Sequence, residues 1–227
     1  MTNTLHRYGT AESFFDDYVI FALPAKGGKQ TGDPLPALRR FLEIAMEYNP
    51  VNIGDSAHGG AMRPTEHDKA LDHFGTRPTT PDFERVLAGI DTATTFSAVF
   101  STREDAEAFV QRLAEEDLGL CINISSSISN AMNCCKAAGL TRHSVGYSLG
   151  FEGIGDHVPN RHVLALSTMC GHGMISQSLA KKMIDFVKEN RRTPDEVIAG
   201  LSRFCSCGIF NPVRARRIIE DARKKTY

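Results

Sequence analysis

Three cysteines and one histidine in the last third of the chain form two close pairs of potential metal ligands. One residue separates Cys170 from His172, one separates Cys205 from Cys207, and 32 residues lie between the pairs. Thiolate sulfur and imidazole nitrogen are the donors that bind zinc and iron–sulfur clusters, and each close pair can chelate locally. The spacing therefore predicts one metal centre held by all four residues. The alternative that needs no metal is that these cysteines are small packing residues.

The predicted elements around the two pairs would bring them together. We expect the apolar segment 162–169 to be a strand that ends at Cys170, followed by three helices. Residues 193–196 have the pattern of a capping box with proline at the first helical position, and Asn211 with Pro212 begins the last helix. Both ligand pairs thus lie at the ends of helices, where a helical hairpin can place them side by side.

Residues from about 170 to 225 resemble the small helical [2Fe-2S] domain of the bacterioferritin-associated ferredoxins. In that family a Cys-x-Cys pair, two helices, a Cys-x-x-Cys pair and a final short helix follow in this order. Two departures are visible: His172 stands at the second cysteine, and the second pair has one intervening residue in place of two. The resemblance implies an iron–sulfur cluster, of the [2Fe-2S] type found in that family, with three cysteines and one histidine as ligands.

Three functions follow from this ligand set, and the sequence leaves all three open. The first is an iron–sulfur protein in redox transfer, or a cluster-dependent oxidoreductase that acts on a small-molecule substrate. The second is a zinc-stabilised, non-enzymatic protein that binds a ligand or a partner. The third is an enzyme in which Cys170 is the nucleophile and His172 its base.

Three further residues are candidates for an additional site. Cys134 and Cys135 are adjacent in a predicted helix, so their side chains point in different directions, and we expect one of them to be a core residue. The other would be free to act with His143. Cys121 alternates with isoleucines in a predicted strand, and we interpret it as a packing residue.

The body that precedes the metal segment is predicted to be α+β. Residues 92–125 have the strand–helix–strand pattern of a ferredoxin-like split βαβ element, with a capping box after the first strand. Residues from about 99 to 125 also resemble the first βαβ unit of CutA-like and ACT-like domains, which implies the fold element alone. We predict an α+β body over 1–168, with a long irregular loop at 54–82, and a helical metal-binding segment over 169–227.

The net charge of −1 conceals an uneven distribution. Residues 181–227 hold 12 Lys and Arg against 6 Asp and Glu, whereas residues 1–180 hold 14 against 21. We expect an acidic or redox protein partner for this basic end and do not expect nucleic acid; a homo-oligomer stays open. The longest apolar run has six residues, at 18–23, so we expect no membrane segment and a cytoplasmic location.

Overall fold

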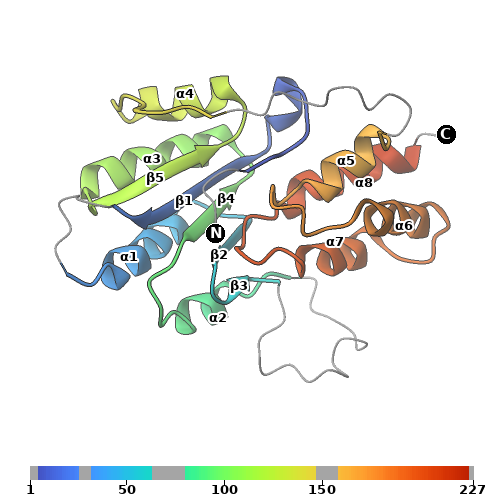
Figure 1. Cartoon of the computed structure of the whole chain (residues 1–227), viewed down its shortest axis with the longest axis horizontal. Helices are drawn as coiled ribbons and strands as arrows, with labels where there is room; N and C mark the ends of the chain where they lie inside the picture. The colour runs from blue at the N-terminus through green and yellow to red at the C-terminus, as the bar shows by residue number, and fades with distance from the viewer. Residues whose placement is uncertain (1–4, 26–31, 63–79, 147–157, 225–227) are drawn as a thin grey trace.

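The computed structural model of the chain describes residues 5–25, 32–62, 80–146 and 158–224 (Figure 1). These residues form a mixed α and β fold with eight α-helices and a five-stranded antiparallel sheet. The strands are β1 Tyr18–Pro24, β2 Asn52–Asp55, β3 Gly59–Gly60, β4 Phe96–Phe100 and β5 Leu120–Ser125. The helices are α1 Leu35–Met46, α2 Phe83–Ala88, α3 Arg103–Glu116, α4 Ile128–Ala137, α5 Arg161–Ser167, α6 Gln177–Lys188, α7 Pro194–Ser202 and α8 Pro212–Lys224, with a 3-10 turn at Ala11–Phe14.

The sheet has the strand order β3-β2-β4-β1-β5, with each neighbouring pair antiparallel. Strand β1 lies between β4 and β5, so α3 connects two strands that are separated by a third. In the same way α1 connects β1 to β2 across β4. The strand–helix–strand unit predicted over residues 92–125 therefore forms, with its first strand beginning at Phe96 and its two strands split around β1.

Both faces of the central strands are buried. Ile20 and its register partner Ala98 face α1 and α3, where Phe41 packs edge-on against Phe109 at a ring distance of 5.2 Å. Val19 and its partner Val99 face the opposite way, into a core shared with α5, α6, α7 and α8. Figure 1 shows these four helices grouped beside the sheet. The sheet thus separates an α1/α3 layer from the C-terminal helical layer.

The predicted strand at 162–169 is wrong, because the chain forms helix α5 there. All residues of α5 from His162 to Ser167 are buried, and only Arg161 at its start is exposed. The apolar run therefore shows no alternation of buried and exposed positions that would distinguish a strand from a helix. The signal that marks the helix is Asn160, whose side chain accepts hydrogen bonds from the backbone N–H groups of His162 and Val163. The predicted domain boundary after residue 168 follows α5 directly, and α5 packs against α6 and α8.

The segment predicted as an irregular loop at 54–82 is partly regular. The Asp55 carboxylate accepts hydrogen bonds from the N–H groups of Ala57 and His58, and this turn folds the chain back so that β3 pairs with β2. Residues 63–79 lie outside the described part of the chain. No helix among the described residues combines the length and the apolar character needed to span a membrane.

Candidate metal centre

The two predicted ligand pairs lie next to each other. Cys170 and His172 occupy the turn after α5, and Cys205 and Cys207 occupy the loop between α7 and α8. The Sγ atoms of Cys205 and Cys207 are 3.9 Å apart, and Cys207 Sγ is 3.6 Å from His172 Nδ1. The Cys170 side chain interacts with both Cys205 and His172. The four side chains therefore form a closed ring of contacts.

The donor atoms of this ring do not yet form a coordination sphere. Across the described ranges of the chain, no group of three or more His, Cys, Asp or Glu side chains is arranged to hold a metal ion as it stands. All three thiols are free and buried. The chain nevertheless places the four residues next to one another, in the turn after α5 and the loop before α8.

Two thiols in the ring, those of Cys170 and Cys205, favour their protonated forms. The contact with Cys205, together with burial, raises the pKa of Cys170 to about 12. The pKa of Cys205 is also raised to about 12, because its contact with Cys170, which lowers the pKa, is outweighed by the contact with Cys207 and by burial. A nucleophilic cysteine needs its thiolate, so this environment does not favour Cys170 as a nucleophile.

The loop with the second ligand pair is fixed to the sheet by polar side chains. Ser97 on β4 donates a hydrogen bond to the Cys207 carbonyl, and Asn52 on β2 donates one to the Phe210 carbonyl at 2.9 Å. Both donors are buried on the face of the sheet that meets the helical layer. The sheet therefore determines where Cys205 and Cys207 lie.

Gly208 permits the close approach of this loop. Its φ is +73°, and a Cβ atom at this position would lie 2.6 Å from Gly54 Cα in β2. Only glycine meets both requirements at low cost, because other residues rarely adopt this φ and no side chain fits against the Gly54 backbone.

The turn with the first ligand pair is held by the N-terminal segment. The His6 N–H donates to the Gly171 carbonyl at 3.0 Å, and the Tyr8 N–H donates to Thr168 Oγ1 at 2.9 Å. Gly171 has a φ of +70°, and a Cβ there would lie 2.8 Å from Leu5 Cβ. The segment thus lies directly on the turn.

A small hollow adjoins the ligands. It has a volume of about 10 Å³, which is about enough for one water molecule. It is lined by Leu5, Phe21, Thr95, Ser97, His172, Cys207 and Ile209.

The residues predicted for an additional site are not brought to this centre. Cys134 is buried in the core between the sheet and α3, on the opposite side of the sheet from Cys170. Cys135 is half-buried and His143 is exposed. Cys121 pairs with Leu23 in the sheet and is half-buried, and the Asn123 side chain contacts its sulfur at 3.7 Å.

Two polar clusters escaped the sequence reasoning. At the β2–β3 turn, the His58 ring lies between two carboxylates. Its Nδ1 is 3.1 Å from the buried carboxylate of Asp55, and its Nε2 is 3.4 Å from the exposed carboxylate of Asp91. The spacing of Asp55 and His58 is a usable signal, whereas Asp91 is distant in sequence. The second cluster contains Arg7, Asp17 and Arg214, and nothing in the sequence relates these residues to one another.

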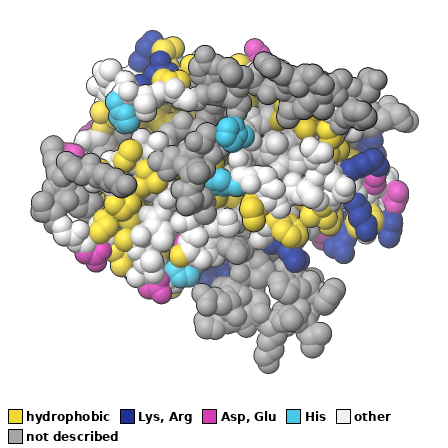
Figure 2. Space-filling model, viewed as in Figure 1, with side chains coloured by type: hydrophobic (Ala, Val, Ile, Leu, Met, Phe, Trp, Pro, Cys, Tyr) yellow, Lys and Arg dark blue, Asp and Glu magenta, His cyan; other side chains and the backbone are white. Residues whose placement is uncertain are grey.

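The basic end of the chain is partly neutralised by its own acidic residues. Figure 2 shows Lys and Arg side chains gathered on the side of the molecule formed by the C-terminal helices. Ion pairs within this region include those of Lys181 with Asp185, Arg191 with Glu189, Arg216 with Asp195, and Arg223 with Glu220. The charge available to an acidic partner is therefore smaller than the residue count indicates.

Comparison with known proteins yields no match: no protein-family model, curated protein or solved structure is significantly similar to this chain. The site is therefore interpreted from its own geometry.

Proposed function

We propose that Cys170, His172, Cys205 and Cys207 bind a single metal ion, and that the ion is zinc. The observation that carries the proposal is the mutual proximity of the four side chains. Around a tetrahedral zinc ion, bond lengths of about 2.3 Å to sulfur and 2.0–2.1 Å to nitrogen put two sulfurs about 3.8 Å apart and a sulfur and a nitrogen about 3.5 Å apart. The corresponding distances here are 3.9 Å and 3.6 Å.

The same proximity favours one ion over the [2Fe-2S] cluster that the family resemblance implies. In such a cluster the two ligand pairs bind different iron atoms, so donors from opposite pairs are kept apart. Here Cys207 contacts His172 across the pairs, and Cys170 interacts with Cys205. An iron–sulfur centre on these residues would need the two loops to separate, and it is the main competing outcome of the experiment below.

A closed set of three cysteines and one histidine is typical of structural zinc, because no coordination position is left for water or substrate. The ion would join the α5–α6 turn to the α7–α8 loop, and the latter is already hydrogen-bonded to the sheet. The proposed role is therefore to fasten the helical layer to the sheet in a protein that binds a ligand or partner. The complete burial of Cys170 supports this role over nucleophilic catalysis, because a reactive cysteine must be reached by its substrate.

We also infer that the body is ferredoxin-like. Elements β1, α1, β2, β4, α3 and β5 follow one another in the β-α-β-β-α-β order, interrupted by β3 and α2. Their strands have the spatial order β2-β4-β1-β5, which gives two split βαβ units. This supports the fold that the sequence predicts for the body.

Metal and acid-labile sulfide analysis tests the proposed centre. We expect protein purified without air to contain one zinc ion per chain, no sulfide and no visible absorption. Cys205→Ser should lose the metal because it removes a central ligand, whereas Cys121→Ser, a half-buried thiol outside the ring, should keep it.

Each other result has a definite meaning. Two iron and two sulfide ions per chain, with a coloured spectrum, would establish the cluster in place of zinc. Equal metal content in the two variants would refute the ligand set, and metal-free wild-type protein that does not take up zinc would refute the metal centre itself.

A further inference from the structure

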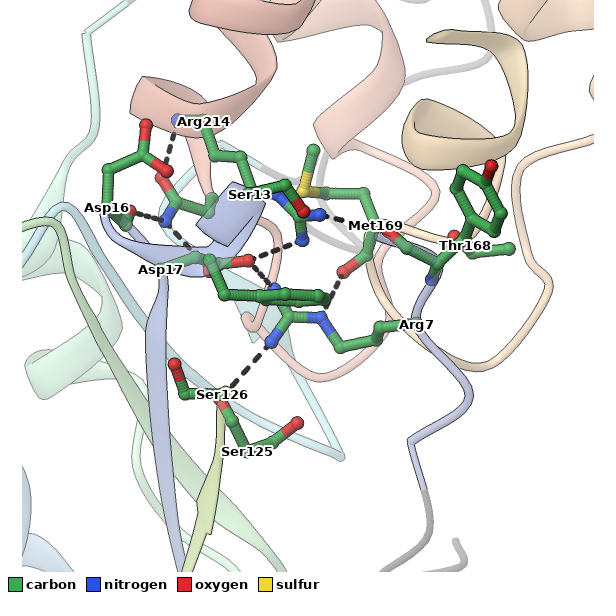
Figure 3. A network of polar contacts seen from close by, with 12 residues as sticks. Arg7, Ser13, Asp16, Asp17, Ser125, Ser126, Thr168, Met169 and Arg214 are labelled. Carbon is green, nitrogen blue, oxygen red and sulfur yellow. Dashed lines mark hydrogen bonds and ion pairs between the residues drawn. The ribbon is translucent and has the colours of Figure 1, made fainter. Parts of the chain in front are cut away.

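A buried polar network lies beside the two ligand segments and contacts the chain near both of them, at Met169 and at Asn211. Figure 3 shows Arg7, Asp17 and Arg214 at its centre. Their side chains are almost completely buried, with exposed fractions of 3%, 0% and 1%. Two guanidinium groups thus share one carboxylate in the interior.

Arg7 connects this network to the first ligand pair. Its Nε donates a hydrogen bond to the Met169 carbonyl at 3.2 Å, directly before Cys170. Its Nη1 donates to the Ser125 carbonyl at the end of β5 at 3.3 Å, and its Nη2 forms an ion pair with Asp17. One planar side chain therefore connects the ligand turn, the sheet and the carboxylate.

Asp17 connects the network to the second ligand pair. Its Oδ1 accepts a hydrogen bond from Asn211 Nδ2 at 2.9 Å, and its Oδ2 accepts one from Arg214 Nη1 at 2.6 Å. Asn211 lies at the end of the loop that contains Cys205 and Cys207, and its Oδ1 accepts from the Arg214 N–H at the start of α8. A path of hydrogen bonds thus runs from one ligand segment to the other.

We propose that Arg7 is a positioning residue that holds the Cys170–His172 turn in register with the Cys205–Cys207 loop. This inference rests on the proposed metal centre. Buried ion pairs contribute little net stability, because desolvation offsets the attraction between the charges. What this network provides is a fixed geometry between two segments that each carry half of the ligands, and ligand orientation by such outer residues commonly changes metal affinity by about 10- to 100-fold.

Arg217 provides a matched control. It belongs to the same polar region and has the same charge, but it pairs with Asp16 and donates to the Ser13 carbonyl. These contacts are with the 3-10 turn and the residues that precede β1, and neither ligand segment takes part in them. Loss of Arg217 removes a guanidinium and an ion pair without releasing the Cys170 turn.

The experiment is Co²⁺ titration of the reduced, metal-free full chain, with a competing chelator and absorbance as the readout. We expect Arg7→Gln to weaken Co²⁺ binding about 10- to 100-fold and to change the ligand-field bands at saturation, since the donors are no longer held in place. Arg7→Lys keeps the positive charge beside Asp17 but loses the planar set of guanidinium N–H donors. Its Co²⁺ affinity should therefore lie between those of Arg7→Gln and wild type. The Co²⁺ affinity of Arg217→Gln should stay within about twofold of that of wild type.

The inference is overturned if the Arg7 variants bind Co²⁺ with the affinity and spectrum of Arg217→Gln. If Arg7→Gln does not fold, Arg7→Lys decides by the same comparison. Wild-type protein that binds no Co²⁺ would instead refute the metal centre. If wild type binds Co²⁺ tightly and the Arg7 variants bind it equally well, the metal centre is retained and only the role of Arg7 is refuted.

Discussion

Gly208, directly after the second ligand pair, sets how closely that pair approaches the sheet. Its left-handed backbone turns the chain toward α8, and its missing side chain lets the loop contact Gly54. At this one position a conformational requirement and a packing requirement coincide. Gly139, at the end of α4, has a similar φ of +66° but has no atom within 4 Å of where its Cβ would be.

Substitutions at Gly208 and Gly139 separate the energetic cost of a steric clash from that of a left-handed backbone. We expect Gly208→Ala to lower the free energy of unfolding by about 3 kcal/mol, since it adds a clash with the β2 backbone to the strain of a left-handed alanine. Gly139→Ala should cost about 1 kcal/mol, from strain alone. Urea unfolding of both variants measures the difference. Equal losses would show that the loop can move away from the sheet without cost.

Helix α5 is the element that leads into the first ligand pair, and it shows where sequence reasoning reaches its limit. The capped helix α3 and the flanking strands β4 and β5 could be predicted, because each has a clear period and a start signal. The hydrophobic pattern could not predict helix α5, because burial on all sides removes the periodic alternation of apolar and polar residues. The ligand pairs were visible as short local spacings, whereas the Arg7 network depends on contacts between opposite ends of the chain.

The N-cap of α5 can be tested by itself. We expect Asn160→Ala to lower the free energy of unfolding by about 1 kcal/mol, because the N–H groups of His162 and Val163 lose their acceptor. Asn160→Asp should remain close to wild type, since its carboxylate accepts the same hydrogen bonds and suits a helix N-terminus. Denaturant midpoints at neutral pH compare the three proteins. An alanine variant as stable as wild type would mean that the cap does not determine the helix.

On the scale of the whole molecule, the sheet divides the interior into two cores with different thiol content. The core that faces α5 to α8 contains the three cysteines of the proposed centre, and the core that faces α1 and α3 contains Cys134. Burial, reinforced by Glu107, raises the pKa of Cys134 from 9.0 to about 12. This thiol therefore links the stability of the fold to alkaline pH without involving the metal ligands.

The sign of this linkage follows from the raised pKa. Below pH 9 Cys134 is protonated in both the folded and the unfolded chain, and between pH 9 and about 12 only the unfolded chain releases the proton. Stability therefore falls as pH rises through this window. From pH 7 to pH 10, we expect wild type to lose about 1.4 kcal/mol more than Cys134→Ala. Urea titrations at both pH values, with excess zinc present, measure this; parallel losses would contradict the expected shift.

The Arg7–Asp17–Arg214 network also has a consequence for the order of folding. Arg214 bonds to the Tyr8 carbonyl across 206 positions of sequence and to Asp17 across 197. At ribosomal elongation rates of about 5–20 residues per second, Asp17 is synthesised about 10 to 40 s before Arg214 exists. Until α5 to α8 have been synthesised, Val19 and Phe21 on β1 lack their covering helices. Closure of the network is thus a long-range event that waits for Arg214, and the proposed ligand set is complete only after Cys207 has been synthesised.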